Sequence, residues 1–215
     1  MNVEASYNRW ASCYDSMVNP TRDLDREAAQ TNFAGRSFSR ILEVGCGTGK
    51  NTQWMTEFAD HIVAMDLSEE MLHQAMSKVS SSKVHWRRAD IRNAWGDLGD
   101  PFDLITFHLV LEHVQDLLFV FDQADRTLMP GGFVYVSELH PFKQYLGSQA
   151  RFESEHGTQL VEAYLHHVSD YVSAAKHVGW KLVDLGEWFD SEPVDSKAAA
   201  VPRLITLMFQ RPASV

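Results

Sequence analysis

The chain has 215 residues, 45% of them hydrophobic, which is enough for one domain with a buried core. Its formal net charge of -10 argues against general nucleic-acid binding, because neutralising phosphates needs a stripe of basic side chains. No apolar run approaches the length of a membrane span and the first residues lack the features of a signal peptide, so we expect a cytoplasmic protein.

The first 35 residues precede the first predicted strand and carry aromatic side chains at helical spacing. Tyr7, Trp10 and Tyr14 recur three or four residues apart, which places their rings on one face of a helix. Such a face either packs on a core or closes over a ligand site. We treat residues 1–35 as an N-terminal cap segment.

Residues 41–49 read ILEVGCGTG, so three glycines at alternate positions follow an apolar strand. Glycine lacks a Cβ and tolerates positive φ, which allows a tight turn whose backbone approaches a ligand. A dinucleotide-binding turn would have glycine where this chain has Lys50, and a phosphate-binding loop would have Ser or Thr where it has Asn51. The turn therefore indicates a nucleoside site that has no cradle for phosphate.

Three more strands of the buried type follow, each ending near a polar side chain. We expect them over 61–66, ending in Asp66, over 84–88, shortly before Asp90, and over 102–107, directly before His108. In an open parallel sheet, ligands bind beyond the carboxyl ends of the strands. We expect these side chains and Glu43 to surround one crevice, with Asp66 accepting hydrogen bonds from a ribose.

The second half continues the alternation of helices and strands. We expect a helix over 116–128 that stops at a Pro-Gly-Gly turn, a strand over 133–138, a helix over 169–177, and strands over 181–188 and 203–211. Only residues 190–202 separate the last two strands, which should pair antiparallel. The pattern predicts an α/β fold with a single doubly wound, Rossmann-like sheet of seven strands, mostly parallel with an antiparallel last strand, and helices on both faces.

The glycine turn, with Glu43 two residues before it, resembles the first motif of the class I S-adenosylmethionine-dependent methyltransferases, written acid-x-Gly-x-Gly-x-Gly. The resemblance covers about residues 7–211, and the layout is similar to methyltransferases that act on trans-aconitate or on malonyl-carrier thioesters. It implies S-adenosyl-L-methionine as the cofactor and S-adenosyl-L-homocysteine as the product. The cofactor contacts that it implies are Tyr7, Tyr14, Glu43, Gly45, Cys46, Gly47, Gly49, Asp66, Leu67, Met71, Asp90, Ile91 and His108.

Residues 139–166 form an insertion after the fifth strand, within a single domain that spans 1–215. We treat the insertion as a lid that selects the acceptor, because loops that follow strand ends lie over the crevice. Four side chains are the catalytic candidates: His108 and His140 as bases, Arg151 as an anchor for an anion, and Tyr145 as a hydrogen-bonding group. The spacing of His108, Glu112 and His113 departs from the inverted zinc-protease motif, so we expect no metal site.

The resemblance implies an enzyme that methylates a small molecule. A carboxylate acceptor, with a pKa of about 4, is nucleophilic at neutral pH, whereas a phenol or an ammonium group, near 10, needs a base. Carboxylate O-methylation is the preferred hypothesis. N- or hydroxyl O-methylation with a histidine base is one alternative, and a non-catalytic regulatory protein that binds the cofactor is another. We expect a monomer or homodimer that has no nucleic-acid or membrane partner.

Overall fold

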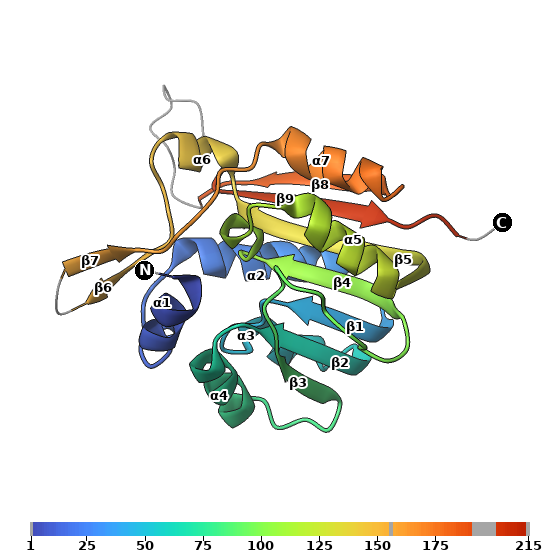
Figure 1. The fold of residues 1–215 in the computed structure, drawn as a ribbon, viewed down its shortest axis with the longest axis horizontal. Coiled ribbons are helices and arrows are strands. Elements are labelled where there is room, and N and C mark those ends of the chain that lie inside the picture. Colours follow the sequence, from blue (N-terminus) through green and yellow to red (C-terminus); the bar gives the residue numbers. More distant parts are fainter. Residues whose placement is uncertain (1, 155–156, 191–200, 214–215) are drawn as a thin grey trace.

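The computed structural model describes residues 2–154, 157–190 and 201–213, and a mixed seven-stranded sheet forms its centre (Figure 1). The strand order is β3-β2-β1-β4-β5-β9-β8, and β9 runs antiparallel to both of its neighbours. This confirms the predicted fold class and the antiparallel last strand. The strands are β1 (Phe38–Val44), β2 (Ala59–Asp66), β3 (Val84–Arg88), β4 (Phe102–His108), β5 (Leu128–Leu139), β8 (Lys181–Trp188) and β9 (Leu204–Gln210).

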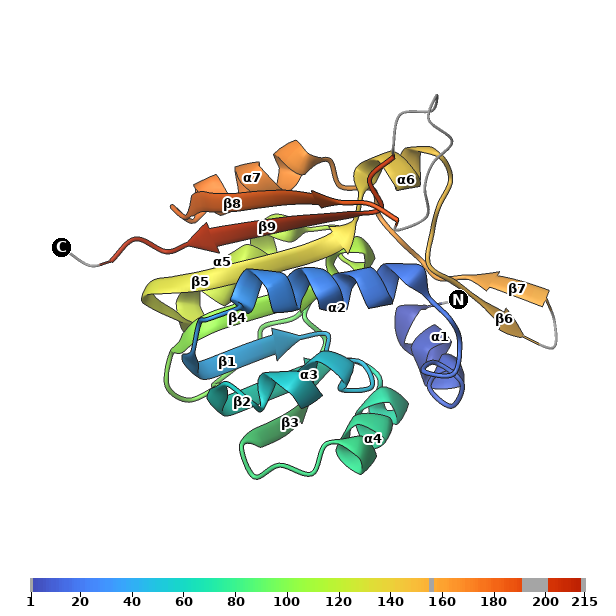
Figure 2. The ribbon, with the colours of Figure 1, turned by 180° about the vertical axis from the view of Figure 1, so that it is seen from behind.

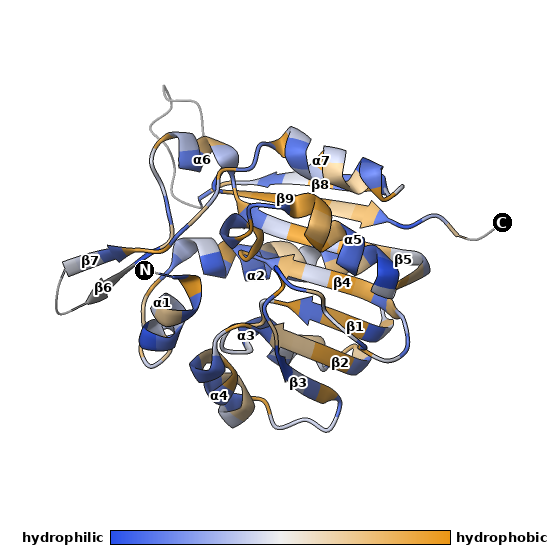
Figure 3. Cartoon of the chain, in the orientation of Figure 1, coloured by the Kyte–Doolittle hydropathy of each residue, from blue (hydrophilic) through white to orange (hydrophobic). Residues whose placement is uncertain are grey.

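Helices cover both faces of the sheet (Figures 1 and 2). On one face, α2 (Pro20–Phe33), α3 (Lys50–Met55) and α4 (Glu69–Lys78) pack on β1 and β2 through a cluster that includes Phe33, Met55 and Leu72. On the other face, α5 (Leu117–Thr127) and α7 (Val168–His177) contribute Phe121 and Tyr171 to a second cluster. Apolar residues concentrate along β4, β5 and β9 between these layers (Figure 3). Burial on both faces explains why the central strands are nearly continuous apolar runs.

The N-terminal segment forms a short helix, α1 (Val3–Trp10), beside the carboxyl ends of the strands, and then leads into α2. Asn2 caps α1 and Asn19 caps α2, each accepting hydrogen bonds from backbone amides of the first turn. Trp10 and Val3 pack with Met71 of α4 and Val161 in a separate small apolar cluster. The aromatic spacing therefore predicts a helix correctly for Tyr7 and Trp10, whereas Tyr14 lies beyond the end of α1. The helix lies over the end of the sheet where the crevice is expected.

The insertion contains a one-turn helix and a hairpin. Helix α6 (Pro141–Tyr145) follows β5, and β6 (Arg151–Ser154) pairs antiparallel with β7 (Gly157–Leu160). The hairpin extends beyond the sheet on the side where α1 lies (Figures 1 and 2). Among the described residues, no helix is long and apolar enough to cross a membrane.

One predicted boundary is wrong. The strand expected over 133–138 begins at Leu128, directly after α5, and the Pro-Gly-Gly sequence lies inside β5. Its register against β4 shifts there, since Phe102 pairs with Leu128 but Leu104 pairs with Phe133. The extra residues form an irregularity in the ladder, which is where proline and glycine occur in strands. The segment expected to link the last two strands lies mainly outside the described residues.

Candidate active site

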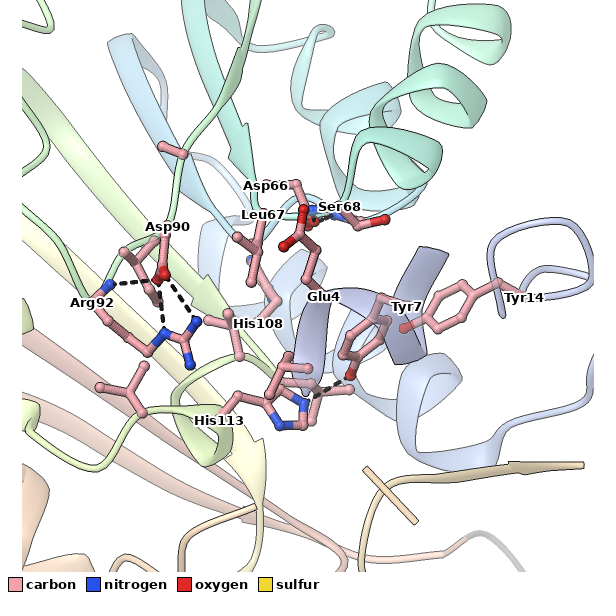
Figure 4. A pocket seen from close by; sticks show the side chains of 18 residues that line it. Glu4, Tyr7, Tyr14, Asp66, Leu67, Ser68, Asp90, Arg92, His108 and His113 are labelled. Atoms are coloured by element: carbon pink, nitrogen blue, oxygen red, sulfur yellow. Dashed lines mark hydrogen bonds and ion pairs between the residues drawn. The ribbon is translucent and has the colours of Figure 1, made fainter. Parts of the chain in front are cut away.

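A pocket opens at the carboxyl ends of β1, β2, β3 and β4, beneath α1 (Figure 4). It contains about 690 Å³ of empty space, including its open mouth. The sequence-predicted residues that line it are Tyr7, Tyr14, Gly45, Gly47, Asp66, Leu67, Asp90, Ile91 and His108. We call this the nucleoside pocket. Residues from four strand ends and the cap segment thus meet at one place, as the strand pattern predicts.

The glycine turn brings backbone against this pocket. Gly45 has φ +78°, and a Cβ there would lie 2.5 Å from a methyl carbon of Val110, so no side chain fits. Gly47 also has positive φ, and nothing would meet its Cβ within 4 Å, so its backbone faces open space in the pocket. The turn presents bare backbone to a ligand, which fits the close approach of a nucleoside. Gly49 instead packs against Ala75 and Trp86 and orients α3.

Asp66, at the end of β2, holds the glycine turn and also lines the pocket (Figure 4). Its Oδ2 accepts a hydrogen bond from Gly47 N at 2.8 Å, and its Oδ1 accepts one from Ser68 N at 2.8 Å. Burial raises the pKa of this carboxyl to about 6, although the backbone amides lower it. At neutral pH the group is therefore mainly ionised. Its remaining lone pairs suit hydroxyl donors such as those of a ribose.

Asp90 and Ile91 follow β3 at the opposite wall of the pocket. Asp90 receives a bidentate ion pair from Arg92, with both donor–acceptor distances 2.8 Å, and this pairing holds its pKa below the usual range. The carboxylate is therefore charged and fixed in position. Ile91 is buried and supplies an apolar surface next to it. Together they can contact the amino edge and the face of a base.

Glu43, Cys46 and His108 lie behind the glycine turn, in a smaller adjoining pocket. Glu43 is buried and accepts a hydrogen bond from the Thr52 hydroxyl, and burial raises its pKa to about 7. The partner of Glu43 is thus the Thr52 side chain of α3. Among the described contacts, no backbone amide of the glycine turn donates a hydrogen bond to Glu43. The His108 Nδ1 atom lies 2.9 Å from Asp25 of α2, whereas His108 Nε2 is buried without a hydrogen-bond partner in the described structure.

Tyr7 of the cap contacts a histidine that the sequence reasoning did not select. The Tyr7 hydroxyl lies 2.8 Å from Nε2 of His113, in the 3-10 turn Leu111–His113 (Figure 4). Nδ1 of His113 lies 2.6 Å from the carbonyl oxygen of Glu162, so Nδ1 carries the proton and Nε2 accepts from Tyr7. Burial lowers the pKa of His113 and keeps it neutral. Only tertiary structure brings these residues together, since 106 positions separate them.

A second pocket, which we call the acceptor pocket, adjoins the nucleoside pocket beneath the hairpin. Tyr7, Tyr14 and Leu109 line both pockets and form their junction. Arg151 lines only the acceptor pocket, together with Glu112. Leu109 is the one residue other than glycine with positive φ among those described, at +52°. The amides of the two residues that follow it are held by Glu138 Oε1 at 2.9 and 2.7 Å.

Four predicted residues lie outside these pockets: Gly49, Met71, His140 and Tyr145. His140 caps α6: its Nδ1 accepts from Phe142 N at 3.1 Å, and its Nε2 lies 3.2 Å from Glu187. Both nitrogens are therefore engaged, and the structure does not place this imidazole as a base at the junction. Tyr145 is 54% exposed and its hydroxyl contacts His167, and Met71 is fully buried among apolar side chains. No cluster of three or more metal-ligating side chains occurs in the described part of the chain.

Comparison with known proteins agrees with this geometry. A family model described as a methyltransferase domain matches residues 42–136, which run from β1 to β5 and include the glycine turn. The ubiquinone biosynthesis O-methyltransferase of Xanthomonas oryzae pv. oryzae is 29% identical over 165 residues, which cover 76% of this chain and 67% of that protein.

Solved structures share the fold. The N-methyltransferase NodS from Bradyrhizobium japonicum, in complex with S-adenosyl-L-homocysteine, has a TM-score of 0.73 at 16% identity and covers 99% of this chain and 100% of that one. A complex of DhpI with SAM and HEP has a TM-score of 0.73 at 23% identity and covers 97% and 95% of the two chains. A particular likeness to the trans-aconitate or malonyl-carrier methyltransferases stays a prediction. The chain has the fold of the class I S-adenosylmethionine-dependent methyltransferases, and its residues 42–136 match the methyltransferase domain family.

Proposed function

We propose that this enzyme transfers a methyl group to a carboxylate oxygen of a small molecule. The observation that carries the proposal is Arg151, whose side chain lines the acceptor pocket and forms no ion pair with any described residue. A guanidinium matches the geometry of a carboxylate and binds it bidentately. The name O-methyltransferase of the Xanthomonas relative supports an oxygen acceptor.

The cofactor is assigned to the nucleoside pocket. Asp66 would accept hydrogen bonds from the ribose, Asp90 and Ile91 would hold the adenine, and Tyr7 and Tyr14 would lie near the methionine part. S-adenosylmethionine supplies an electrophilic methyl group when bound. The two tyrosine rings are neutral at physiological pH, because burial raises the pKa of Tyr14 to about 12 and that of Tyr7 well above its usual value.

The junction of the two pockets is where the acceptor would meet this methyl group. Methyl transfer is an in-line displacement, so the protein contributes alignment and exclusion of water. Leu109 and the rings of Tyr7 and Tyr14 supply an apolar junction, and Arg151 would orient the carboxylate from the far side of the acceptor pocket. A carboxylate is already ionised at neutral pH, so the mechanism needs no base.

Methyl-transfer assays across a panel of small carboxylic acids, with S-adenosyl-L-homocysteine as the readout, test this proposal. We expect Arg151→Ala to reduce kcat/KM by about a hundredfold, since a hydrogen-bonded charge pair contributes roughly 1.5–3 kcal/mol. Affinity for S-adenosyl-L-homocysteine should stay within about twofold. Arg126→Ala, an exposed arginine on α5, is the matched control. Turnover of amines or phenols alone, with Arg151→Ala silent, would reject the carboxylate assignment.

A second candidate, methylation of a hydroxyl or amine, is favoured by the pair formed by His108 and Asp25. Burial lowers the pKa of His108, but the Asp25 carboxylate has the opposite effect and the net shift is upward. Asp25 accepts a hydrogen bond from Nδ1 of His108 and keeps the proton there, so Nε2 is free to act as a base. His108 lines both the nucleoside pocket and the smaller pocket behind the glycine turn. A rate that rises with pH through the His108 pKa, and disappears in His108→Gln, would favour this candidate. A carboxylate acceptor predicts that His108→Gln keeps the pH profile of the wild type.

A further inference from the structure

The acceptor pocket contains a carboxyl group that the described residues leave without a full set of partners. Glu112, in the 3-10 turn, lines this pocket and is only 6% exposed. Its Oε2 atom is buried and has no hydrogen-bond partner. Buried polar atoms in folded proteins almost always have a partner, and an isolated acceptor of this kind is costly. Glu112 lines the pocket, so a ligand that brings a donor to this carboxyl group would supply the missing partner.

Although the side chain of Gln144 hydrogen-bonds the carboxyl group, the neighbours of Glu112 leave its Oε2 atom without a partner. Its Oε1 lies 3.8 Å from His113 Nε2, but that nitrogen already accepts the Tyr7 hydroxyl. Burial raises the pKa of Glu112 to about 7, and the nearby Gln144 side chain lowers it only in part. The other ionisable groups that face it are Tyr7, Tyr171 and Glu138, none of them cationic.

Arg151 lines the same pocket but does not form an ion pair with Glu112. The Arg151 guanidinium and the Glu112 carboxyl group thus line the same pocket without contacting each other. A ligand with a carboxylate alone would pair with Arg151 and leave Glu112 unsatisfied. A ligand that carries a donor as well would satisfy both groups, and a site built in this way discriminates strongly against analogues that lack the donor.

We infer that Glu112 binds a hydrogen-bond donor of the methyl acceptor, so that the acceptor is a small acid that also bears an ammonium or hydroxyl group. This inference rests on the proposed carboxylate function. Glu112 is a specificity-determining residue in this assignment, and Arg151 anchors the opposite end of the acceptor. Amino acids and hydroxy acids both carry a hydrogen-bond donor, and the experiment below distinguishes between the two classes.

Binding calorimetry on the full chain saturated with S-adenosyl-L-homocysteine provides the test. The probes are the straight-chain acids from propanoate to hexanoate, their monoamino and monohydroxy derivatives at each carbon, and the matching amines and alcohols without a carboxyl group. We expect one amino or hydroxy acid to bind at least about tenfold more tightly than its plain parent. Measured at pH 7 in buffers of different ionisation enthalpy, an amino acid should release protons on binding, because its ammonium group favours the ionised form of Glu112.

Three variants separate a binding role from a structural one. Glu112→Gln should remove the proton release and cut the preference for the amino acid to about threefold or less, with affinity for the plain acid unchanged. Arg151→Ala should weaken every acid. Glu57→Gln, an exposed carboxylate outside the pockets, should change nothing.

The outcomes distinguish this inference from the proposed function. Equal binding of plain and donor-bearing acids, with Glu112→Gln silent, would overturn the inference and leave the carboxylate assignment intact. Binding of an amine or alcohol that has no carboxyl group, lost in Glu112→Gln but not in Arg151→Ala, would overturn the carboxylate assignment and keep the Glu112 contact. Absence of binding by every probe would overturn both.

Discussion

Asp66 shows how one carboxylate can hold a loop and still serve a ligand. Its two oxygens each accept one backbone amide, from Gly47 and Ser68, which fixes the glycine turn relative to the start of α4. An ionised carboxylate has about four acceptor sites, so half of its capacity remains for hydroxyl groups in the pocket. Burial raises its pKa to about 6, so cofactor binding should weaken below that pH as the carboxylate takes up a proton.

We predict that Asp66→Asn weakens binding of S-adenosyl-L-homocysteine by tenfold to a hundredfold. The substitution keeps an acceptor for one amide but removes the charge, and charged hydrogen bonds contribute roughly 1.5–3 kcal/mol. Calorimetry at pH 7.5 measures the change. Asp60→Asn, an exposed aspartate on the same strand, serves as the control. Unchanged affinity in a variant with normal circular dichroism would mean that the ribose lies elsewhere.

The residues that sequence reasoning found differ from those it missed in how they are positioned. Asp66, Asp90 and His108 sit at or just beyond strand ends, and parallel pairing alone brings such positions to one edge. Asp25, Glu112 and His113 enter the site from a helix and a short turn, whose orientation depends on packing over the whole sheet. In the sequence, Glu112 and His113 stand out only because they partly match the inverted zinc-protease motif. No local feature of the sequence indicates that they are buried.

At the scale of elements, α1 is attached to the domain mainly through polar contacts. Tyr7 bonds to His113, Asn8 accepts a hydrogen bond from Ser68 at the cap of α4, and Glu4 pairs with Arg88 of β3. Its apolar contacts are confined to a small cluster with Met71 and Val161. An element held in this way opens at a lower free-energy cost than the central strands. The helix can therefore admit a cofactor without disturbing the sheet.

We predict that Tyr7→Phe loosens this helix. Loss of the hydrogen bond to His113 should cost about 1 kcal/mol, which favours the open form by about fivefold. Hydrogen exchange of the amides in residues 3–10 should accelerate by that factor, and affinity for S-adenosyl-L-homocysteine should fall to a similar degree. Tyr164→Phe, which removes a hydroxyl bonded to Glu162 on the surface, should leave both unchanged. Equal exchange rates in the two variants would show that Tyr7 does not hold α1.

The ends of helices and strands could be predicted where local chemistry fixes them. The prediction was wrong where pairing between strands sets the boundary. Ser68 caps α4 through Met71 N, as its place before two glutamates suggests. The Pro-Gly-Gly sequence reads locally as a turn, yet the pairing of Leu128 with Phe102 of β4 extends β5 back to Leu128. Pairing across a sheet is a tertiary interaction, so a breaker motif can be absorbed as an irregularity. The position of the β6–β7 hairpin beside α1 likewise depends on tertiary packing.

For the whole molecule, buried carboxyl groups gather at the end of the sheet that holds the pockets. Glu43, Glu112 and Asp66 all have a pKa raised chiefly by burial, to about 7, 7 and 6, and the pKa of Glu138 is raised well above its usual value. Groups perturbed in this way concentrate at functional sites. Because they are protonated in the folded state at a pH where the unfolded chain has released the proton, they couple stability to pH.

We predict that the ligand-free protein loses stability as pH rises from 5 to 7.5, with Glu43 as one identifiable source. The Glu43 carboxyl has a pKa of about 7 when folded and a reference value of 4.5. Between these values the folded state binds more protons than the unfolded state, so the free energy of unfolding decreases with rising pH. At 1.36 kcal/mol per pKa unit, Glu43 contributes on the order of 3 kcal/mol across the window.

Urea unfolding of the wild type and of Glu43→Gln, at pH 5 and 7.5, measures this contribution. The amide keeps an oxygen that accepts from the Thr52 hydroxyl but cannot ionise, so the variant should lose less stability over the interval than the wild type. Asp25 has a lowered pKa, so it changes the free energy of unfolding only at acid pH. His113 is buried and neutral, and it contributes equally in both proteins. The difference between the two slopes therefore belongs to Glu43. Equal slopes of unfolding free energy against pH in the two proteins would mean that Glu43 is ionised throughout. The groups behind the glycine turn would then carry a negative charge, which His108 in the same pocket would have to balance.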